Sequence, residues 1–277
     1  MGSLFVVATP IGNLEDITLR ALRVLKEVDL IAAEDTRKTL KLLSHYDIHT
    51  PLVSYHRHSS REKRERLVHT LQSSDVALVS EAGMPGVSDP GQDLILSTIE
   101  AGLPVVPVPG PSALLSGLVV SGLPTDRFLY LGFLPRVKSD RRKLLASVAT
   151  APYTLVLFEA PHRLSASLAD LEETLGDREA AAARELTKLH EEVVRGRLSG
   201  LRSVFDERAP RGEFTIVVAP PEEQARSTEP TTSISDLAAR LRAEGESGKG
   251  AVRRLMEEGG ASRREAYQAW LDSDRGA

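Results

Sequence analysis

One pattern recurs along this chain and constrains its fold more than any other feature: a short apolar run, a loop rich in glycine and proline, then a helical pattern. The clearest copy is VALVSEAGMPGVSDPG at 76–91, which leads into a helical pattern from Gln92 to Glu100. Open α/β sheets build their ligand crevices from strands that lead into such loops. Because Gly83 and Gly86 lack a Cβ, we expect loop backbone to lie directly against a ligand there.

The recurrence of this pattern predicts an α/β protein with two α/β domains. The length agrees, since 277 residues exceed one ordinary domain and suit two. The early strands are apolar throughout, which indicates a parallel sheet covered on both faces. After a proline-rich segment the pattern restarts, and we expect a second, more mixed sheet. The predicted strands are 4–8, 29–33, 52–55, 76–79 and 105–108 in a domain at 1–109, and 128–133, 153–158, 180–183 and 214–219 in a domain at 110–220.

The C-terminal part of the chain has a different composition. Residues 221–233 are rich in Pro, Glu, Ser and Thr, which is typical of a linker. In 234–277 apolar residues recur at helical spacing in three short segments split by glycines, which predicts a helix-turn-helix-like domain that binds RNA. A small helical cap with solvated charges is the alternative. The basic residues of this domain include Lys249, Arg253, Arg254, Arg263 and Arg264.

Several classes of protein are excluded or disfavoured. There is no cysteine, so disulfides, thiolate metal sites and cysteine nucleophiles are excluded, and a reducing cytoplasmic location is compatible. No apolar run approaches the roughly 20 residues that span a bilayer, and the N-terminus lacks a basic leader, so we expect neither membrane insertion nor secretion. A formal net charge of −4 argues against a generally cationic nucleic-acid binder and leaves only local basic patches for that role.

The loops also lack the usual chemistry for phosphates and metals. There is no GxxxxGK[ST] motif and no GxGxxG after the first strand, and the loop prolines remove backbone N–H donors that a polyphosphate needs. His56 and His58 lie close together in sequence without a third ligand at useful spacing, so no metal is predicted. We therefore expect a ligand that is not polyanionic.

Eight motifs occur in order along the chain: VATPIGNLEDITLRAL, AAEDTR, SEAGMPGVSDPG, VPGPSALL, LGFLPR, FEAPHR, ARELTKLHEE and GEFTIVVA. Together they strongly resemble the tetrapyrrole-methylase superfamily (class III methyltransferases). Within it they resemble the branch that methylates the ribose 2′-hydroxyl of a cytidine in small-subunit (16S) ribosomal RNA. The resemblance covers Leu4 to about Pro220, and the tail is similar to the C-terminal helical domain of that branch.

This resemblance implies S-adenosylmethionine bound in a cleft between the two α/β domains, a homodimer, and small-subunit ribosomal RNA or the small ribosomal subunit as partner. Glu81 and Met84 stand where the family pattern has Asp and Thr. A sulfonium cofactor needs no phosphate cradle, which agrees with the proline-bearing loops. By position, the family's cofactor contacts fall on Pro10, Gly12, Glu81, Gly83, Pro85, Gly86, Ser88, Asp89, Ser112, Ala113, Leu134, Phe214 and Thr215.

Methyl transfer to a ribose hydroxyl needs the oxygen placed in line with the donor bond and a group that accepts the proton. We look for that group among charged residues in loops at strand ends. The predicted catalytic residues are Glu34, Asp35, Arg37, Glu159, His162, Arg163, Glu185 and Lys188, with His56 and His190 as further candidate acceptors. For any single carboxylate an ion pair or a helix cap is the alternative, since three of them have a basic partner within one turn.

RNA contacts are expected at basic clusters in 57–66, in 136–143 and in the tail. Two rival functions stay open. A methylase of small tetrapyrroles on the same fold would not need the basic tail, and its cleft should contain more aromatic residues than an aromatic content of 4% suggests. A non-catalytic RNA-binding or ribosome-assembly protein could keep the cofactor pocket, but the cluster of carboxylates and histidines argues against it.

Overall fold

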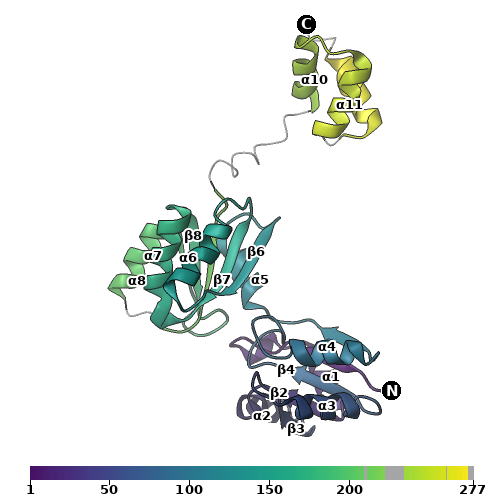
Figure 1. The fold of residues 1–277 in the computed structure, drawn as a ribbon, viewed down its shortest axis with the longest axis vertical. Helices are drawn as coiled ribbons and strands as arrows, with labels where there is room; N and C mark the ends of the chain where they lie inside the picture. Colours follow the sequence, from purple (N-terminus) through teal and green to yellow (C-terminus); the bar gives the residue numbers. More distant parts are fainter. Residues whose placement is uncertain (209–210, 222–233, 260, 274–277) are drawn as a thin grey trace. The chain divides into compact units, whose positions relative to one another are not determined.

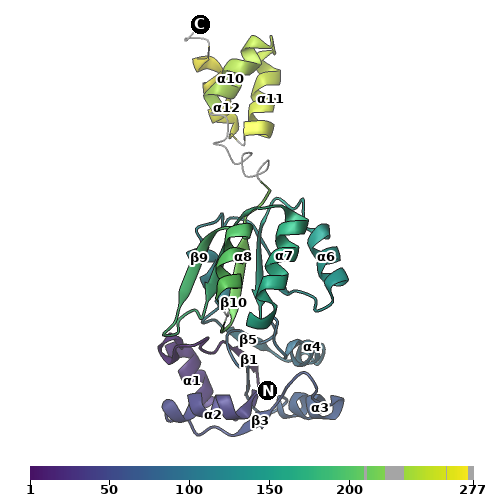
Figure 2. The ribbon, with the colours of Figure 1, turned by 90° about the vertical axis from the view of Figure 1, so that its left-hand side faces the viewer.

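The computed structural model describes residues 1–208, 211–221, 234–259 and 261–273. The chain divides into two compact units, Met1–Pro220 and Pro221–Ala277. Figures 1 and 2 show the elements of each unit from two sides. The larger unit contains two five-stranded sheets, and the elements among the described residues of the smaller unit are all helices.

The first sheet is parallel throughout, with strand order β3-β2-β4-β1-β5. Its strands are β1 (Leu4–Val7), β2 (Leu30–Ala33), β3 (Leu52–Ser54), β4 (Val76–Val79) and β5 (Val105–Val108). Its helices are α1 (Leu19–Glu27), α2 (Thr36–His45), α3 (Arg61–Thr70) and α4 (Gln92–Glu100), with a 3₁₀ turn at Leu14–Asp16. Successive strand residues enter different cores: Val7 packs with α1 and α2, whereas Val6 packs with α3 and α4. The apolar strands are therefore covered on both faces, as predicted.

The second sheet is mixed, with order β6-β7-β10-β8-β9. Only β6 and β7 pair in parallel; the other pairings are antiparallel. The strands are β6 (Phe128–Phe133), β7 (Thr154–Glu159), β8 (Glu179–Arg184), β9 (Glu192–Arg197) and β10 (Phe214–Val218). The helices are α5 (Ala113–Ser121), α6 (Lys138–Ser147), α7 (Leu164–Leu175) and α8 (Leu198–Glu207), with a 3₁₀ turn at Pro161–Arg163.

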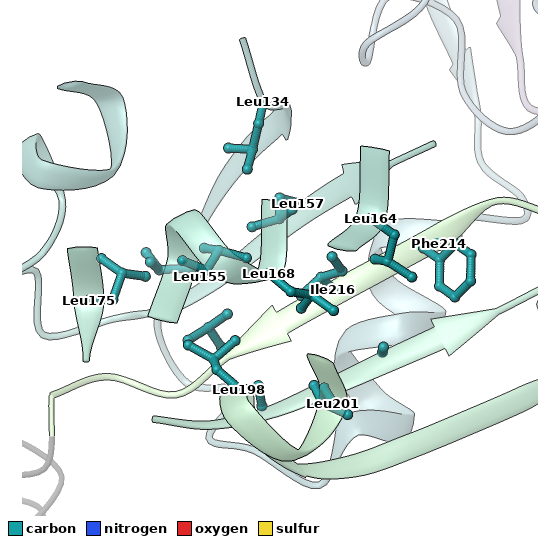
Figure 3. Close-up of a cluster of buried hydrophobic side chains, with 14 of the residues drawn as sticks. Leu134, Leu155, Leu157, Leu164, Leu168, Leu175, Leu198, Leu201, Phe214 and Ile216 are labelled. Atoms are coloured by element: carbon teal, nitrogen blue, oxygen red, sulfur yellow. The ribbon is translucent and has the colours of Figure 1, made fainter. Parts of the chain in front are cut away.

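Helices α6, α7 and α8 cover one face of this second sheet, and α5 packs on the other against β7, β8 and β10. Figure 3 shows the core beneath α7 and α8, where leucines such as Leu168 and Leu201 meet Leu157 and Ile216 of the sheet. On the α5 side, a Cβ on Gly117 would overlap the side chain of Thr215. This glycine therefore lets α5 lie close against β10, which brings the start of α5 to the end of the sheet.

The smaller unit contains α10 (Ile234–Ala243), α11 (Gly248–Gly259) and α12 (Arg263–Asp272). Leu237, Leu241 and Leu255 form its buried core, with Trp270 packed against them. Three short helices with a small apolar core agree with the predicted pattern. Of the predicted linker, only Pro221 lies within the described residues. In the part of the chain that the structure describes, no helix has the length and apolar character needed to span a bilayer.

Candidate active site

A cleft of about 220 Å³ lies within the larger unit, where loops of the first sheet meet strand ends of the second. On one side it is lined by Ile11, after β1, and by residues 81–84 and 87–89, after β4. These loops follow the carboxyl ends of parallel strands, where α/β sheets bind ligands. On the other side it is lined by the start of α5, the ends of β6, β7 and β8, and the start of β10.

The loop after β4 is held in a conformation that few residues adopt. Its φ angles are +80° at Gly83, +84° at Gly86, +61° at Ser88 and +127° at Gly91. Gly83 exchanges two backbone hydrogen bonds of 2.9 Å with Thr9, which fixes the loop to the end of β1. Gly83 lines the cleft.

Gly86 has a different role from the one expected for it. It is not among the residues that line the cleft, and a Cβ placed on it would point at α4, 3.5 Å from Ile95 Cδ1. The positive φ of Gly86 accounts for glycine there. The prediction that ligand approach requires Gly86 therefore has no support in the geometry.

Glu185 and Lys188 lie together at the cleft, at the end of β8. Lys188 Nζ donates to Glu185 Oε1 at 2.9 Å, and this hydrogen bond holds the pKa of Glu185 below its usual range. Gly12 and Gly212 make room for these two side chains, since a Cβ on Gly12 would overlap Lys188 and a Cβ on Gly212 would overlap Glu185. Gly12, expected to contact the cofactor, therefore serves the placement of a lysine that does line the cleft.

The cleft is rich in carboxylates: Glu81, Asp89, Glu159, Glu185 and Glu213 line it, with Lys188 as the cationic side chain among the described residues. Burial, reinforced by the charge of Glu34, raises the pKa of Asp89 to about 6. Burial also raises the pKa of Glu34, partly offset by the backbone N–H of Glu81. A site that crowds negative charge in this way favours a cationic ligand.

Glu159 and Arg163 form an ion pair that is more buried than the pair of Glu185 and Lys188. The Glu159 side chain is 0% exposed and accepts hydrogen bonds from Ala160 N, at 2.9 Å, and from Ser167 Oγ. Arg163 lies beside it, with Nε 3.4 Å from Glu159 Oε1, and donates to the carbonyls of Leu134 and Pro135 at 2.7 and 3.0 Å. This pair therefore fixes the chain that follows β6.

The Leu134 side chain, expected near the cofactor, is buried in the core of the second sheet (Figure 3). Its neighbour Phe133 lines the cleft instead, together with Phe158. Tyr130 meets Phe158 edge to face at 5.3 Å, and Phe133 lies 5.6 Å from Phe158. The sequence analysis did not identify these aromatic residues as part of the site. The motifs LGFLPR and FEAPHR nevertheless contain Phe133 and Phe158, at the ends of β6 and β7.

The predicted catalytic residues of the first sheet lie beside the cleft and do not line it. Asp35 is the N-cap of α2, where its Oδ1 accepts the backbone N–H groups of Arg37 and Lys38, at 2.8 and 3.4 Å. The Arg37 side chain is exposed and pairs with the same carboxylate, which lowers the pKa of Asp35. Glu34 reaches the cleft indirectly, since the backbone N–H of Glu81 donates to Glu34 Oε2 at 3.4 Å. His162 is exposed and also lies outside the lining.

Some of the predicted cofactor contacts line the cleft and others do not. Pro10, Gly12, Pro85, Gly86 and Leu134 are outside the lining. Those that line the cleft are Glu81, Gly83, Ser88, Asp89, Ser112, Ala113, Phe214 and Thr215. Of the two departures from the family pattern, Glu81 pairs with Lys38 and Met84 packs against the core under α4 while lining the cleft.

Part of the basic cluster at 136–143 forms ion pairs within the fold. Arg141 is buried, with its Nε 2.7 Å from Asp170, and Arg142 binds both Asp170 and Glu173. In the cluster at 57–66, Arg61 and Arg64 also have carboxylate partners, Glu65 and Asp93. Arg57, between the two histidines after β3, is exposed.

Residues 3–202 match the family described as Tetrapyrrole (Corrin/Porphyrin) Methylases. The chain belongs to this family. It is 47% identical to "Ribosomal RNA small subunit methyltransferase I" of Synechocystis sp., over 98% of each chain. The protein of that name from Thermotoga maritima is 49% identical over 79% of this chain and 99% of its own length.

Two solved structures share the fold of the larger part of the chain. Diphthine synthase superposes with a TM-score of 0.64 at 18% identity, over 79% of this chain and 90% of the other. The methyltransferase CobJ reaches 0.60 at 17% identity, over 79% and 95%. The predicted fold class, two α/β sheets of tetrapyrrole-methylase type with a helical C-terminal part, is confirmed. At these sequence identities, the two structures are evidence for the fold only.

Proposed function

We propose that this protein transfers a methyl group from S-adenosylmethionine to the ribose 2′-hydroxyl of a cytidine in small-subunit ribosomal RNA. The observation that carries the proposal is the 47% identity, along 98% of both chains, to a relative named as a small-subunit ribosomal RNA methyltransferase. The proposed substrate places the reaction in the cytoplasm. Binding to RNA without transfer, or transfer to a small tetrapyrrole, are the competing outcomes.

The chemistry of the cleft supports S-adenosylmethionine as the cofactor. Its sulfonium carries a positive charge, and Glu81, Asp89 and Glu213 bring negative charge to the lining. We assign the remaining contacts to Gly83, Ser112, Ala113, Phe214 and Thr215. When bound, the cofactor supplies a methyl group that its own leaving group already activates, so the protein has mainly to position the acceptor and exclude water.

We propose that the pair of Glu185 and Lys188, after β8, removes the proton of the ribose 2′-hydroxyl. Lys188 next to the ribose hydroxyl would lower the pKa of that hydroxyl, and the Glu185 carboxylate would accept its proton as the oxygen takes the methyl group. Both side chains line the cleft and are already hydrogen-bonded to each other at 2.9 Å. The Glu34, Asp35 and Arg37 group lies outside the lining, so we give it no direct part in proton transfer.

The helical unit is proposed to bind RNA, with Lys249, Arg253, Arg263 and Arg264 as phosphate contacts. Its separate core supports a module distinct from the methylase fold. The relative from Thermotoga maritima supports the same division, because its alignment leaves almost nothing of that protein unmatched yet covers only 79% of this chain. We further propose a homodimer, supported by large apolar side chains that the larger unit leaves exposed, among them Leu115, Val119 and Leu189.

The proposal is tested with S-adenosylmethionine labelled in its methyl group and small ribosomal subunits from cells that lack the enzyme. Label should appear in the ribosomal RNA and be recovered as 2′-O-methylcytidine after nuclease digestion. A small tetrapyrrole offered in parallel should stay unlabelled. Label on the tetrapyrrole, or RNA binding with no transfer to any cytidine, would overturn the assignment.

A chain that ends at Pro220 separates the roles of the two units. It should keep its affinity for S-adenosylmethionine, because the cleft residues all precede that point. Its binding to RNA should weaken and depend less steeply on salt, since fewer phosphate contacts release fewer counterions. An unchanged salt dependence would leave the helical unit as a structural cap only.

A further inference from the structure

Strand β6 contains an irregularity that redirects its last residue. Along β6 and β7, Leu129 pairs with Leu155 and Tyr130 with Val156, but Gly132 pairs with Leu157, so Leu131 is an extra residue. Gly132 takes up the irregularity with φ at +64°. A bulge of this kind shifts the alternation of side chains by one position.

The shift decides which way Phe133 points. In a regular strand, Phe133 would share a face with Leu129 and Leu131, which pack against the core under α6, α7 and α8. After the bulge it pairs with Phe158, on the opposite face, and both line the cleft. An aromatic side chain that could be buried is thus left 53% exposed at the cleft.

The surroundings hold this aromatic group in place. Phe158 lies between Tyr130 and Phe133, at ring-centroid distances of 5.3 and 5.6 Å. The Tyr130 hydroxyl is 2.7 Å from Ser88 Oγ, in the loop after β4. A Cβ on Gly132 would lie 3.1 Å from the same Ser88 oxygen, so glycine is favoured there both by φ and by space. The chain after Phe133 is fixed in turn by Arg163.

We propose that Phe133, backed by Phe158, is a stacking platform for the base of the nucleotide whose ribose is methylated. The inference rests on the proposed function and extends it to recognition of the base. Proteins that recognise unpaired RNA stack its bases on aromatic side chains, and a half-exposed ring at the edge of a site suits a base that arrives from solution. The adenine of the cofactor is also a planar base, and the test separates the two.

The kinetic test varies RNA and S-adenosylmethionine independently. Phe133→Ala should raise KM for the small-subunit RNA by about 10- to 100-fold, the range for loss of one base–aromatic stack, and leave cofactor affinity within about 2-fold. Phe133→Tyr should keep a low KM and Phe133→Leu should not, because leucine is apolar without a π-face. The matched control is Phe128→Ala, since Phe128 is 40% exposed at the other end of β6 and does not line the cleft.

Three kinetic results would overturn the platform. An equal loss of affinity for the cofactor would assign the ring to adenine. Leucine as effective as tyrosine would reduce the contact to simple apolar burial. An unchanged KM in Phe133→Ala would leave the ring without a base to bind.

A spectroscopic test does not depend on turnover. The sequence has a single tryptophan, Trp270, so Phe133→Trp combined with Trp270→Phe carries one reporter at the platform. Small-subunit RNA should quench its fluorescence and the cofactor alone should not; Phe128→Trp in the same background should respond to neither. If the unmodified protein does not methylate RNA, the proposed function is wrong. Fluorescence quenching by RNA then tests on its own whether a base stacks at position 133. Bound RNA without quenching would overturn it.

Discussion

The ends of β7 and β8 each place a glutamate near a basic residue, but the two pairs differ in structure. At each strand end a glutamate is followed within about one turn by a basic residue: Glu159, the last residue of β7, by Arg163, and Glu185, the residue after β8, by Lys188. Both strands flank β10 and run in the same direction, so that their last residues, Glu159 and Arg184, both pair with Phe214 of β10. All three residues, Glu159, Glu185 and Lys188, are in the lining of the cleft, but the Glu159 side chain is 0% exposed, whereas those of Glu185 and Lys188 are 22% and 32% exposed.

The difference comes from the chain that follows each strand. After β7 the 3₁₀ turn at Pro161–Arg163 leads into α7, which brings Ser167 onto the Glu159 carboxylate. After β8 the chain takes left-handed φ values at Glu185 (+51°) and Thr187 (+68°). Strained backbone of this kind persists where the surrounding structure requires it, often at functional sites. A charge at a strand end therefore indicates a site only when its partners leave it open to the cleft.

The largest difference between the two pairs should appear in the rate. Glu185→Gln should lower single-turnover methyl transfer by about 10²- to 10⁴-fold, the range for loss of a positioned base, with cofactor affinity and melting temperature nearly unchanged. Lys188→Met should act in the same direction, because the cation that acidifies the hydroxyl is removed. Near-normal rates in both variants would make this pair structural, like the pair after β7.

The pair after β7 should show its effect in stability. Arg163→Met leaves the buried Glu159 carboxylate without its cation and frees two carbonyls, which should lower the free energy of unfolding by about 3–5 kcal/mol in urea titrations. The control is Arg202→Met, which breaks more exposed pairs with Glu172 on α7 and Asp206 on α8 and should cost less than about 1 kcal/mol. Similar losses in the two variants would show that burial does not distinguish these pairs.

The sequence was sufficient for the features that depend on local pattern. Apolar runs such as Val76–Val79 mark buried parallel strands, and the loop at 80–91 marks the cleft, because both follow from short-range chemistry. Strand β9 and helix α8 were missed. β9 is an edge strand with the polar sequence EVVRGR, so neither alternation nor an apolar run identifies it.

The parts of the site that sequence reasoning could not resolve depend on long-range contacts. The partner of Glu159 is eight residues away on α7, and the room for Lys188 comes from Gly12, in the loop after β1 of the first sheet. The bulge that turns Phe133 toward the cleft shows only when β6 is aligned against β7. In each case the decisive neighbour lies outside the local pattern that secondary-structure reasoning uses.

Asp89 extends the comparison to a carboxylate that faces the cleft from the first sheet, and its expected effect is the smallest. Burial first, then the charges of Glu34, Glu81 and Glu213, raise the pKa of Asp89 to about 6, against a hydrogen bond with Ser80 that lowers it. A carboxyl group with a raised pKa holds its proton in the folded protein where the unfolded chain has lost it. Stability from this group should therefore fall as pH rises from about 4 to about 6, and be constant above.

The same titration should govern the ligand. Above pH 6 the charged Asp89 attracts the sulfonium, and below it the neutral acid does not, so affinity for S-adenosylmethionine should fall by at most about tenfold per pH unit on acidification. S-adenosylhomocysteine, which has a neutral sulfur, is the matched ligand and should show a much shallower dependence in calorimetry. Asp89→Asn should bind the two ligands with similar pH profiles and be at least as stable as the parent at pH 7. If both ligands weaken equally below pH 6 in the parent, the charge that responds to pH is not opposite the sulfonium.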